Sequence, residues 1–329
     1  MRAAYRPLRA MWPPCGWGLA SAGVTPPRRP LHLDRRTLLR GGLGGLGVAA
    51  IGGTALGACA DKGDTVAEGV QAGPELSLTA MFPRDVPHVQ VATPTRLPFT
   101  LSDAEGVPFG TLDSALTFRV SFDGEAVGDP TEVPPHGDGV PRPYLPLQFT
   151  FPRPGVYDIE TEHEGTKVST QVQVFTDEEV PSPVVGDALP PASTPTTTQG
   201  FEVDPICTRV PTCPFHEHDL TAALQTDRPI VVLLATPAYC RTTACGPILD
   251  LLIEQAQGLD GPIVIHSEVY KNPKTVRDLA DATLAPLPDL YAMPFEPALF
   301  VTDASHTVVA RGDIVVDRAE MAEMLALAV

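Results

Sequence analysis

Two cysteines five positions apart, Cys240 and Cys245, are the residues of this sequence best suited to chemistry. They follow an apolar run, Ile230 to Ala235, that has the length and branching of a buried strand. A helical pattern of apolar residues comes next and extends to about Gln257. Because a helix N-terminus favours negative charge, it favours thiolate over thiol. The stretch therefore predicts thiol–disulfide chemistry at the point where a strand turns into a helix.

The C-x-x-x-x-C spacing limits how a disulfide between these two cysteines could form. On a regular helix, two Cα atoms five residues apart are separated by roughly 8.6 Å. A disulfide requires a separation of less than about 7 Å. Either the helix begins near Pro247 and leaves both cysteines in a loop, or its first turn is distorted. In a third arrangement, each cysteine pairs with one further upstream.

Composition suggests an acidic chain of two domains. The 329 residues are enough for two domains, and the 37 prolines indicate loops, linkers or edge-rich β structure. The formal net charge is −17. The first 59 residues carry eight arginines and one acidic residue, so the remainder is more acidic still. Such a surface repels nucleic acid and anionic lipid headgroups, and we expect no nucleic-acid partner.

The N-terminal segment, residues 1–59, has the features of a signal peptide with a lipid attachment site. Arg35 and Arg36 open the pattern R-R-T-L-L-R, and a glycine-rich apolar run follows that is a poor membrane span. The arginine pair resembles a twin-arginine export signal, and the L-G-A-C sequence ending at Cys59 resembles a lipoprotein box. These resemblances imply acylation of Cys59 and anchoring in the lipid bilayer on the extracytoplasmic face of the cell membrane. The alternative is a plain membrane anchor with an incidental cysteine.

Export to an oxidising compartment would favour disulfides. Cys15 would be removed with the leader and Cys59 would be lipidated, so four cysteines remain for pairing: Cys207, Cys213, Cys240 and Cys245. An even number favours two disulfides. We expect one between Cys240 and Cys245 and one between Cys207 and Cys213, with the crossed pairings still open.

The sequence divides into an all-β part and an α/β part. Residues 60–74 are small and polar, as in a tether, and residues 177–200 form a Pro/Thr-rich linker. Between them, residues 75–176 contain seven short alternating runs separated by Gly, Pro and Asp turns, which predicts a β-sandwich. The stretch Phe151 to Ile159, F-P-R-P-G-V-Y-D-I, resembles the penultimate strands of immunoglobulin-like bacterial modules. That resemblance implies an immunoglobulin-like sandwich.

The pattern changes to α/β over residues 201–329. After the strand and helix around the cysteine pair, we expect a second buried strand at 262–270 and a helix at 273–283. A hairpin is expected over 298–311, and Asp317 should cap a final helix. These elements alternate along the chain, so they predict a sheet covered by helices.

This order of elements, with a cysteine pair after the first buried strand, resembles the thioredoxin fold. The P-I-L-D sequence that begins seven residues after Cys240 resembles the active-site helix of that family, and Pro297 stands where the family places a cis-proline. The resemblance implies that Cys240 is the exposed nucleophile, that Cys245 is the resolving thiol and that Pro297 shapes the groove for the partner. The partners would be thiols or disulfides of exported or membrane proteins, and no cofactor is implied.

Two departures from that family keep other interpretations open. The cysteines are spaced C-x-x-x-x-C rather than C-x-x-C, and Tyr239 replaces the usual tryptophan. One alternative is a redox-silent, lipid-anchored binding or scaffold protein with structural disulfides. A peroxidase pattern, P-x-x-x-T-x-x-C, fails because Ala238 occupies the proline position.

Copper handling is the other alternative. Copper-delivery proteins of the same fold pair two cysteines with a distant histidine, and His266 on the second strand could serve that role. A variant would use four residues of one short segment: Cys207, Cys213, His216 and His218. Their C-x5-C-x2-H-x-H spacing is not a familiar zinc pattern, and a lone histidine on a buried strand is more often a core residue. We therefore predict no metal site.

Overall fold

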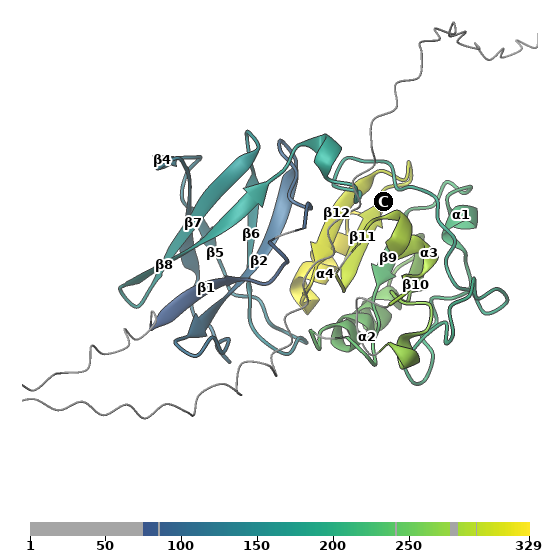
Figure 1. Ribbon diagram of the computed structural model, residues 1–329. Helices are drawn as coiled ribbons and strands as arrows, with labels where there is room; N and C mark the ends of the chain where they lie inside the picture. The colour runs from purple at the N-terminus through teal and green to yellow at the C-terminus, as the bar shows by residue number, and fades with distance from the viewer. Residues whose placement is uncertain (1–74, 85, 241, 277–281, 294) are drawn as a thin grey trace, which may run out of the picture. The chain divides into compact units, whose positions relative to one another are not determined.

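The computed structural model describes residues 75–84, 86–240, 242–276, 282–293 and 295–329 (Figure 1). The signal peptide and tether predicted for residues 1–74, with Arg35, Arg36 and Cys59, lie outside the described residues. All the described residues belong to one compact unit, in which a β-sandwich precedes an α/β region. Among them, no helix has both the length and the apolar character needed to cross a membrane.

Two antiparallel sheets form the sandwich. The first has the order β1-β2-β6 and consists of β1 (Leu76–Ala80), β2 (Pro94–Asp103) and β6 (Leu145–Thr150). The second has the order β4-β3-β7-β8, with β5 paired to β3, and consists of β3 (Leu116–Phe122), β4 (Glu125–Ala126), β5 (Thr131–Val133), β7 (Gly155–His163) and β8 (Thr166–Val174). Alternate residues such as Leu116, Phe118 and Val120 point into the shared core. The predicted β-sandwich is confirmed.

The strand order and one tyrosine make this sandwich immunoglobulin-like. β1, β2 and β6 share one sheet as strands A, B and E of an immunoglobulin domain do, and β3, β7 and β8 share the other as strands C, F and G do; β4 and β5 pair with β3, so the first sheet lacks the usual D strand among the described residues. Tyr157, near the start of β7, donates a hydrogen bond of 2.8 Å from its hydroxyl to the carbonyl of Arg153. A tyrosine corner of this kind is a feature of the fold. Phe122 and Phe151 pack edge-on against the buried Tyr157 ring, so the F-P-R-P-G-V-Y-D-I stretch builds the corner.

The Pro/Thr-rich segment 177–200 has little regular structure but packs against the α/β region. It contains one short 3₁₀ turn, η2 (Asp177–Glu179). Leu189 and Ala192 are buried in a core cluster of the α/β region. The hydroxyl of Thr194 accepts a hydrogen bond from the backbone N–H of Leu220, at the start of a helix. The segment therefore differs from a free linker, because its few apolar side chains are packed in the core of the α/β region.

A four-stranded mixed sheet forms the centre of the α/β region (Figure 1). Its order is β10-β9-β11-β12, formed by β9 (Ile230–Leu234), β10 (Ile263–Ser267), β11 (Ala298–Thr302) and β12 (Val308–Asp313). β10 runs parallel to β9, and β11 runs antiparallel to both β9 and β12. Every residue of β9 is buried, as expected for a central strand covered on both faces.

Helices cover both faces of the sheet. One core cluster combines Val231 and Leu233 with residues of α2 (Cys245–Ala256) and α4 (Arg318–Leu325). The other combines Val232 with residues of α1 (Leu220–Ala223) and α3 (Pro286–Leu290). Because successive side chains of a strand point to opposite faces, this division places α2 and α4 on one face and α1 and α3 on the other.

Most elements expected after residue 200 are present with shorter bounds. The final helix is capped as predicted, because the Asp317 carboxylate accepts a hydrogen bond of 2.9 Å from the backbone N–H of Glu320. The helix expected at 273–283 is represented by a 3₁₀ turn, η3 (Pro273–Thr275), and residues 277–281 lie outside the described residues.

A buried ion pair joins the sandwich to the α/β region within the compact unit. The guanidinium group of Arg96 on β2 pairs with the carboxylate of Glu320 on α4 and also donates to the carbonyl of Asp313 at 3.1 Å. The hydroxyl of Tyr144 donates to the same carboxylate. Both charged side chains are more than nine-tenths buried, so the pair depends on this network rather than on water.

Candidate functional site

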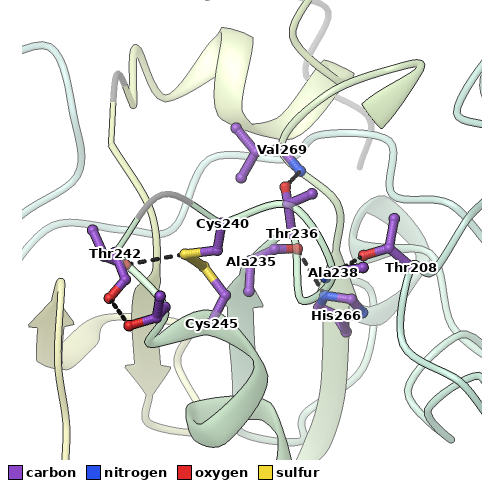
Figure 2. Close-up of a disulfide and its surroundings, with 10 residues drawn as sticks. Thr208, Ala235, Thr236, Ala238, Cys240, Thr242, Cys245, His266 and Val269 are labelled. Atoms are coloured by element: carbon purple, nitrogen blue, oxygen red, sulfur yellow. Dashed lines mark hydrogen bonds between the residues drawn. A yellow bond between two sulfur atoms is a disulfide. The ribbon is translucent and has the colours of Figure 1, made fainter. Parts of the chain in front are cut away.

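A disulfide joins Cys240 to Cys245, as Figure 2 shows. Cys245 is the first residue of α2 and is fully buried, whereas Cys240 lies in the preceding loop and is partly exposed. Their Cα atoms are 5.9 Å apart, which is possible because only one of the two cysteines belongs to the helix. Thr243, with φ of 60°, turns the chain between them. The exposed sulfur therefore comes from the loop and the protected sulfur from the helix.

The N-terminus of α2 provides the electrostatic setting of this pair. Ala244 occupies the N-cap position, and no described side chain caps the helix there. Its first turn contains no acidic residue to compete for the partial positive charge. The Thr242 hydroxyl lies 3.0 Å from the Cys240 sulfur. Once the disulfide is reduced, the positive end of the helix favours a thiolate at the pair, and the Thr242 hydroxyl can donate a hydrogen bond to a thiolate at Cys240.

A buried carboxyl group lies beside the disulfide. One carboxylate oxygen of Glu296 is within 4.8 Å of the sulfur atoms of both Cys240 and Cys245. Its Oε2 atom has no hydrogen-bond partner within the part of the chain that the structure describes. Burial raises the pKa of Glu296 to about 7, although hydrogen bonds with Thr236 oppose the shift. Glu296 can therefore hold or release a proton next to the two sulfurs near neutral pH.

The proline named from the sequence stands directly after this glutamate. The Glu296–Pro297 peptide bond is cis, and β11 begins at the next residue. Sequence analysis named Pro297 and missed Glu296. A signal was present, since Glu296 is the one charged residue in the apolar stretch M-P-F-E-P-A-L-F-V.

The bridge expected between Cys207 and Cys213 is not formed. Among the described cysteines, these two are free, buried thiols. They face two buried imidazole rings, those of His216 and His266, and the four donor atoms all lie within 4.8 Å of one another. His218, which the sequence grouped with them, is exposed instead. The cluster therefore takes its fourth member from β10 rather than from the same short segment.

Distances within this cluster are short. The Nδ1 atom of His266 lies 3.4 Å from the sulfur of Cys213 and 3.3 Å from the Nε2 atom of His216. A hydrogen bond shared between the two thiols lowers the pKa of Cys207 and raises the pKa of Cys213. The pair therefore binds one proton more tightly than the other.

Hydrogen bonds connect the cluster to the loop that carries Cys240 (Figure 2). The Nε2 atom of His266 lies 3.0 Å from the carbonyl oxygen of Ala235, directly after β9. The hydroxyl of Thr208, next to Cys207, accepts a hydrogen bond of 3.1 Å from the backbone N–H of Ala238. Two hydrogen bonds, one to a residue of the cluster and one to its chain neighbour Thr208, thus anchor the loop before Cys240.

A second buried carboxyl group lies on that side. Glu268, two residues after His266, accepts a hydrogen bond from the backbone N–H of Thr208. Burial raises the pKa of Glu268 to about 8, and the hydrogen bonds with Thr208 oppose this. At neutral pH this raised pKa favours the protonated, uncharged form of Glu268.

Comparisons with known proteins give limited information. No protein-family model and no curated protein matches the chain. Solved structures similar to it include an engineered protein (15% identity, 31% of this chain and 19% of that one, TM-score 0.22). They also include the titin immunoglobulin tandem domains A164-A165 (8% identity, 32% and 50%, TM-score 0.20) and titin domain M7 (13% identity, 32% and 99%, TM-score 0.20). The chain thus spans about a fifth of the engineered protein and half of the titin tandem structure. At these TM-scores the likeness carries no argument, and the immunoglobulin-like assignment rests on strand order and the tyrosine corner.

Proposed function

We propose that the protein is a membrane-anchored, extracytoplasmic thiol–disulfide oxidoreductase acting through Cys240 and Cys245. The observation that carries this proposal is the disulfide between a partly exposed loop cysteine and a buried cysteine at a helix N-terminus. An exposed sulfur can be reached by a partner, and a neighbouring protected sulfur can complete the exchange.

The reduced pair would act in two steps. The Cys240 thiolate attacks a sulfur of the partner disulfide, forming a mixed disulfide and releasing one partner thiolate, which takes up a proton. Cys245 then loses its proton and attacks the Cys240 sulfur, which releases the second partner thiol and leaves the Cys240–Cys245 disulfide. Two electrons pass from the pair to the partner, and the same steps in reverse oxidise a dithiol partner. The ionised Glu296 carboxylate, with one oxygen within 4.8 Å of both sulfurs, can accept the proton of Cys245 and return it to the departing partner thiolate.

A thioredoxin-like fold is part of the proposal. The order β9-α2-β10 followed by β11-β12-α4, with the cysteine pair after the first strand, supports it. In that fold Pro297 would lie beside the cysteines and shape the groove for the partner's backbone. The chain departs from the family in its C-x-x-x-x-C spacing and in Tyr239, a residue that is 48% exposed and directly precedes Cys240.

The test is the reduction potential of the pair in the full chain. The protein is equilibrated in glutathione buffers, and mass spectrometry maps the state of each cysteine. A potential between about −120 and −270 mV, confined to Cys240 and Cys245, supports a catalytic dithiol. A value below about −300 mV makes the bridge structural and favours a redox-silent binding protein. Reduction of insulin should also be lost in Cys240→Ser and kept in the matched control His218→Ala, which alters an exposed residue.

Membrane anchoring is supported only by the sequence pattern around Arg35, Arg36 and Cys59. In a bacterial host, wild-type protein should partition into detergent, and Cys59→Ser should release it into the aqueous phase. Replacement of Arg35 and Arg36 by lysine should keep the precursor unprocessed. Unchanged partitioning of Cys59→Ser would refute lipid anchoring at this residue.

A further inference from the structure

We infer that Cys207, Cys213, His216 and His266 form a structural zinc site, separate from the Cys240–Cys245 pair. Three of these residues come from the irregular segment between the linker and α1, and His266 comes from the central sheet. Their four donor atoms lie within 4.8 Å of one another, and no side chain of the four is more than 6% exposed.

Two of the distances between donor atoms are close to those of tetrahedral coordination, and the others are at most 4.8 Å. Zinc binds histidine nitrogen at about 2.0–2.1 Å and cysteine sulfur at about 2.3 Å. At tetrahedral angles these bond lengths place two nitrogens about 3.3 Å apart and a nitrogen and a sulfur about 3.6 Å apart. The structure has 3.3 Å between the His216 and His266 nitrogens and 3.4 Å between His266 and the Cys213 sulfur. A zinc ion therefore fits among these atoms with little movement of the side chains.

The outer hydrogen bonds of the two histidines favour a cation between them. Nδ1 of His216 lies 3.1 Å from the carbonyl oxygen of Pro195, and Nε2 of His266 lies 3.0 Å from that of Ala235. A carbonyl oxygen only accepts, so each of these ring nitrogens carries the proton of its neutral ring. The other nitrogens then direct lone pairs toward each other and toward the two sulfurs, so each needs either a thiol proton or a shared cation as its partner, and a cation satisfies both nitrogens at once. Histidines that bind metals are commonly oriented by such an outer hydrogen bond.

Charge balance and coordination number favour zinc. Two thiolates neutralise the two charges of Zn²⁺, and the imidazoles stay neutral, so the buried site carries no net charge. Binding replaces two thiol protons, which are released to water, and no atom is oxidised. Two sulfurs and two nitrogens in a tetrahedron are typical of zinc. Because all four positions are filled by protein and the site is buried, it has no open position for catalysis.

The site would hold an irregular segment against the sheet and, through it, the loop of the cysteine pair. Thr208 follows the ligand Cys207 and accepts a hydrogen bond from Ala238, two residues before Cys240. The ligand His266 contacts Ala235, at the start of the same loop. Zinc binding is therefore expected to stabilise the fold and to order the approach to Cys240 without taking part in electron transfer.

The main test is the zinc content of the full chain after reduction, incubation with Zn²⁺ and removal of excess metal. We expect one zinc per chain in wild type, in Cys240→Ser and in His218→Ala, whose exposed imidazole is two residues from His216. Cys213→Ser and His266→Ala should lose the metal. Retention of zinc by both ligand variants would overturn the assignment. Since Cys240→Ser cannot carry out the proposed thiol exchange, zinc bound to it supports the site whether or not the protein is an oxidoreductase.

A second measurement needs no variant and so does not depend on variant folding. Titration of the reduced wild-type chain with Co²⁺ should produce thiolate-to-cobalt absorption and the visible bands of tetrahedral cobalt, and Zn²⁺ should displace both. Metal should also protect Cys207 and Cys213 from maleimide while Cys240 still reacts. No cobalt spectrum, binding of Cu⁺ but not Zn²⁺, or a Cys207–Cys213 disulfide formed in the presence of Zn²⁺ would each overturn the proposal.

Discussion

Glu296→Gln should remove a pH dependence of stability that comes from one buried carboxyl group. Burial raises the pKa of Glu296 from 4.5 to about 7, so between these values the folded chain binds a proton that the unfolded chain has lost. The favourable contribution of this proton is complete below pH 4.5 and is lost as the pH rises through about 7. Over that window the free energy of unfolding should fall by about 3 kcal/mol in wild type because of this group. Glutamine cannot ionise, so the variant lacks this loss.

Urea unfolding of the oxidised proteins at a series of pH values measures the effect. The quantity of interest is the difference in unfolding free energy between Glu296→Gln and wild type. It should become more favourable to the variant by about 3 kcal/mol between pH 4.5 and about pH 8. Glu268 ionises in both proteins, so its contribution largely cancels. Glu217→Gln, which replaces an exposed glutamate, should give a flat difference. A flat difference for Glu296→Gln would refute the buried, proton-binding state of this residue.

The same variant tests the proposed role of Glu296 in exchange. Its carboxyl group lies within 4.8 Å of both sulfurs, and burial makes it change charge as the pH passes about 7. Above that pH, a carboxylate beside the pair disfavours a second negative charge on Cys245. The pH profile of disulfide reduction should therefore contain an inflection near 7 in wild type and lack it in Glu296→Gln. Identical profiles would remove Glu296 from the mechanism.

Other predictions follow from the pair, the ion pair and the sandwich. Cys245→Ser should accumulate a mixed disulfide between Cys240 and a partner peptide, seen by mass spectrometry, because the buried resolving thiol is missing. Arg96→Met should cost about 3–5 kcal/mol in denaturant unfolding, because it leaves the Glu320 carboxylate buried without its partner. A cost near that of a surface pair, below about 1 kcal/mol, would contradict the buried network. Tyr157→Phe should cost about 1 kcal/mol by removing the corner hydrogen bond, measured in the same way.

The general architecture was predictable because hydrophobic patterns report burial. The alternating runs of residues 75–176 predicted a sandwich, and the all-apolar run at Ile230 predicted a central strand. The sequence did not show that the segment 177–200 packs against the α/β region. Its apolar residues are too few and too irregularly spaced to form a pattern, and Leu189 is buried by contacts far away in the chain.

The neighbours of Glu296 and His266 could not be deduced from spacing alone. The sequence offered His266 as a third ligand for the Cys240–Cys245 pair, whereas the structure clusters it with the other two cysteines and places Glu296 beside that pair. Which side chains surround these residues depends on how distant segments pack together. A hydrophobic pattern predicts a strand but not the residues of other segments that contact it. The interpretation that relied on local spacing chose His218, because it stands near Cys213 in the chain. The structure instead brings in His266, which lies 53 residues after Cys213.

Two cysteine pairs of nearly equal spacing differ in oxidation state, and their surroundings explain the difference. Cys240 and Cys245 are five positions apart and form a disulfide, whereas Cys207 and Cys213 are six apart and remain thiols. The first pair has a carboxyl group and a helix end as neighbours and no imidazole nitrogen among the donor atoms clustered with it. The second pair faces two imidazole nitrogens held in place by backbone carbonyls. Spacing permits either outcome, so the neighbouring side chains are what distinguish the pair that we propose exchanges electrons from the pair that we propose binds a cation.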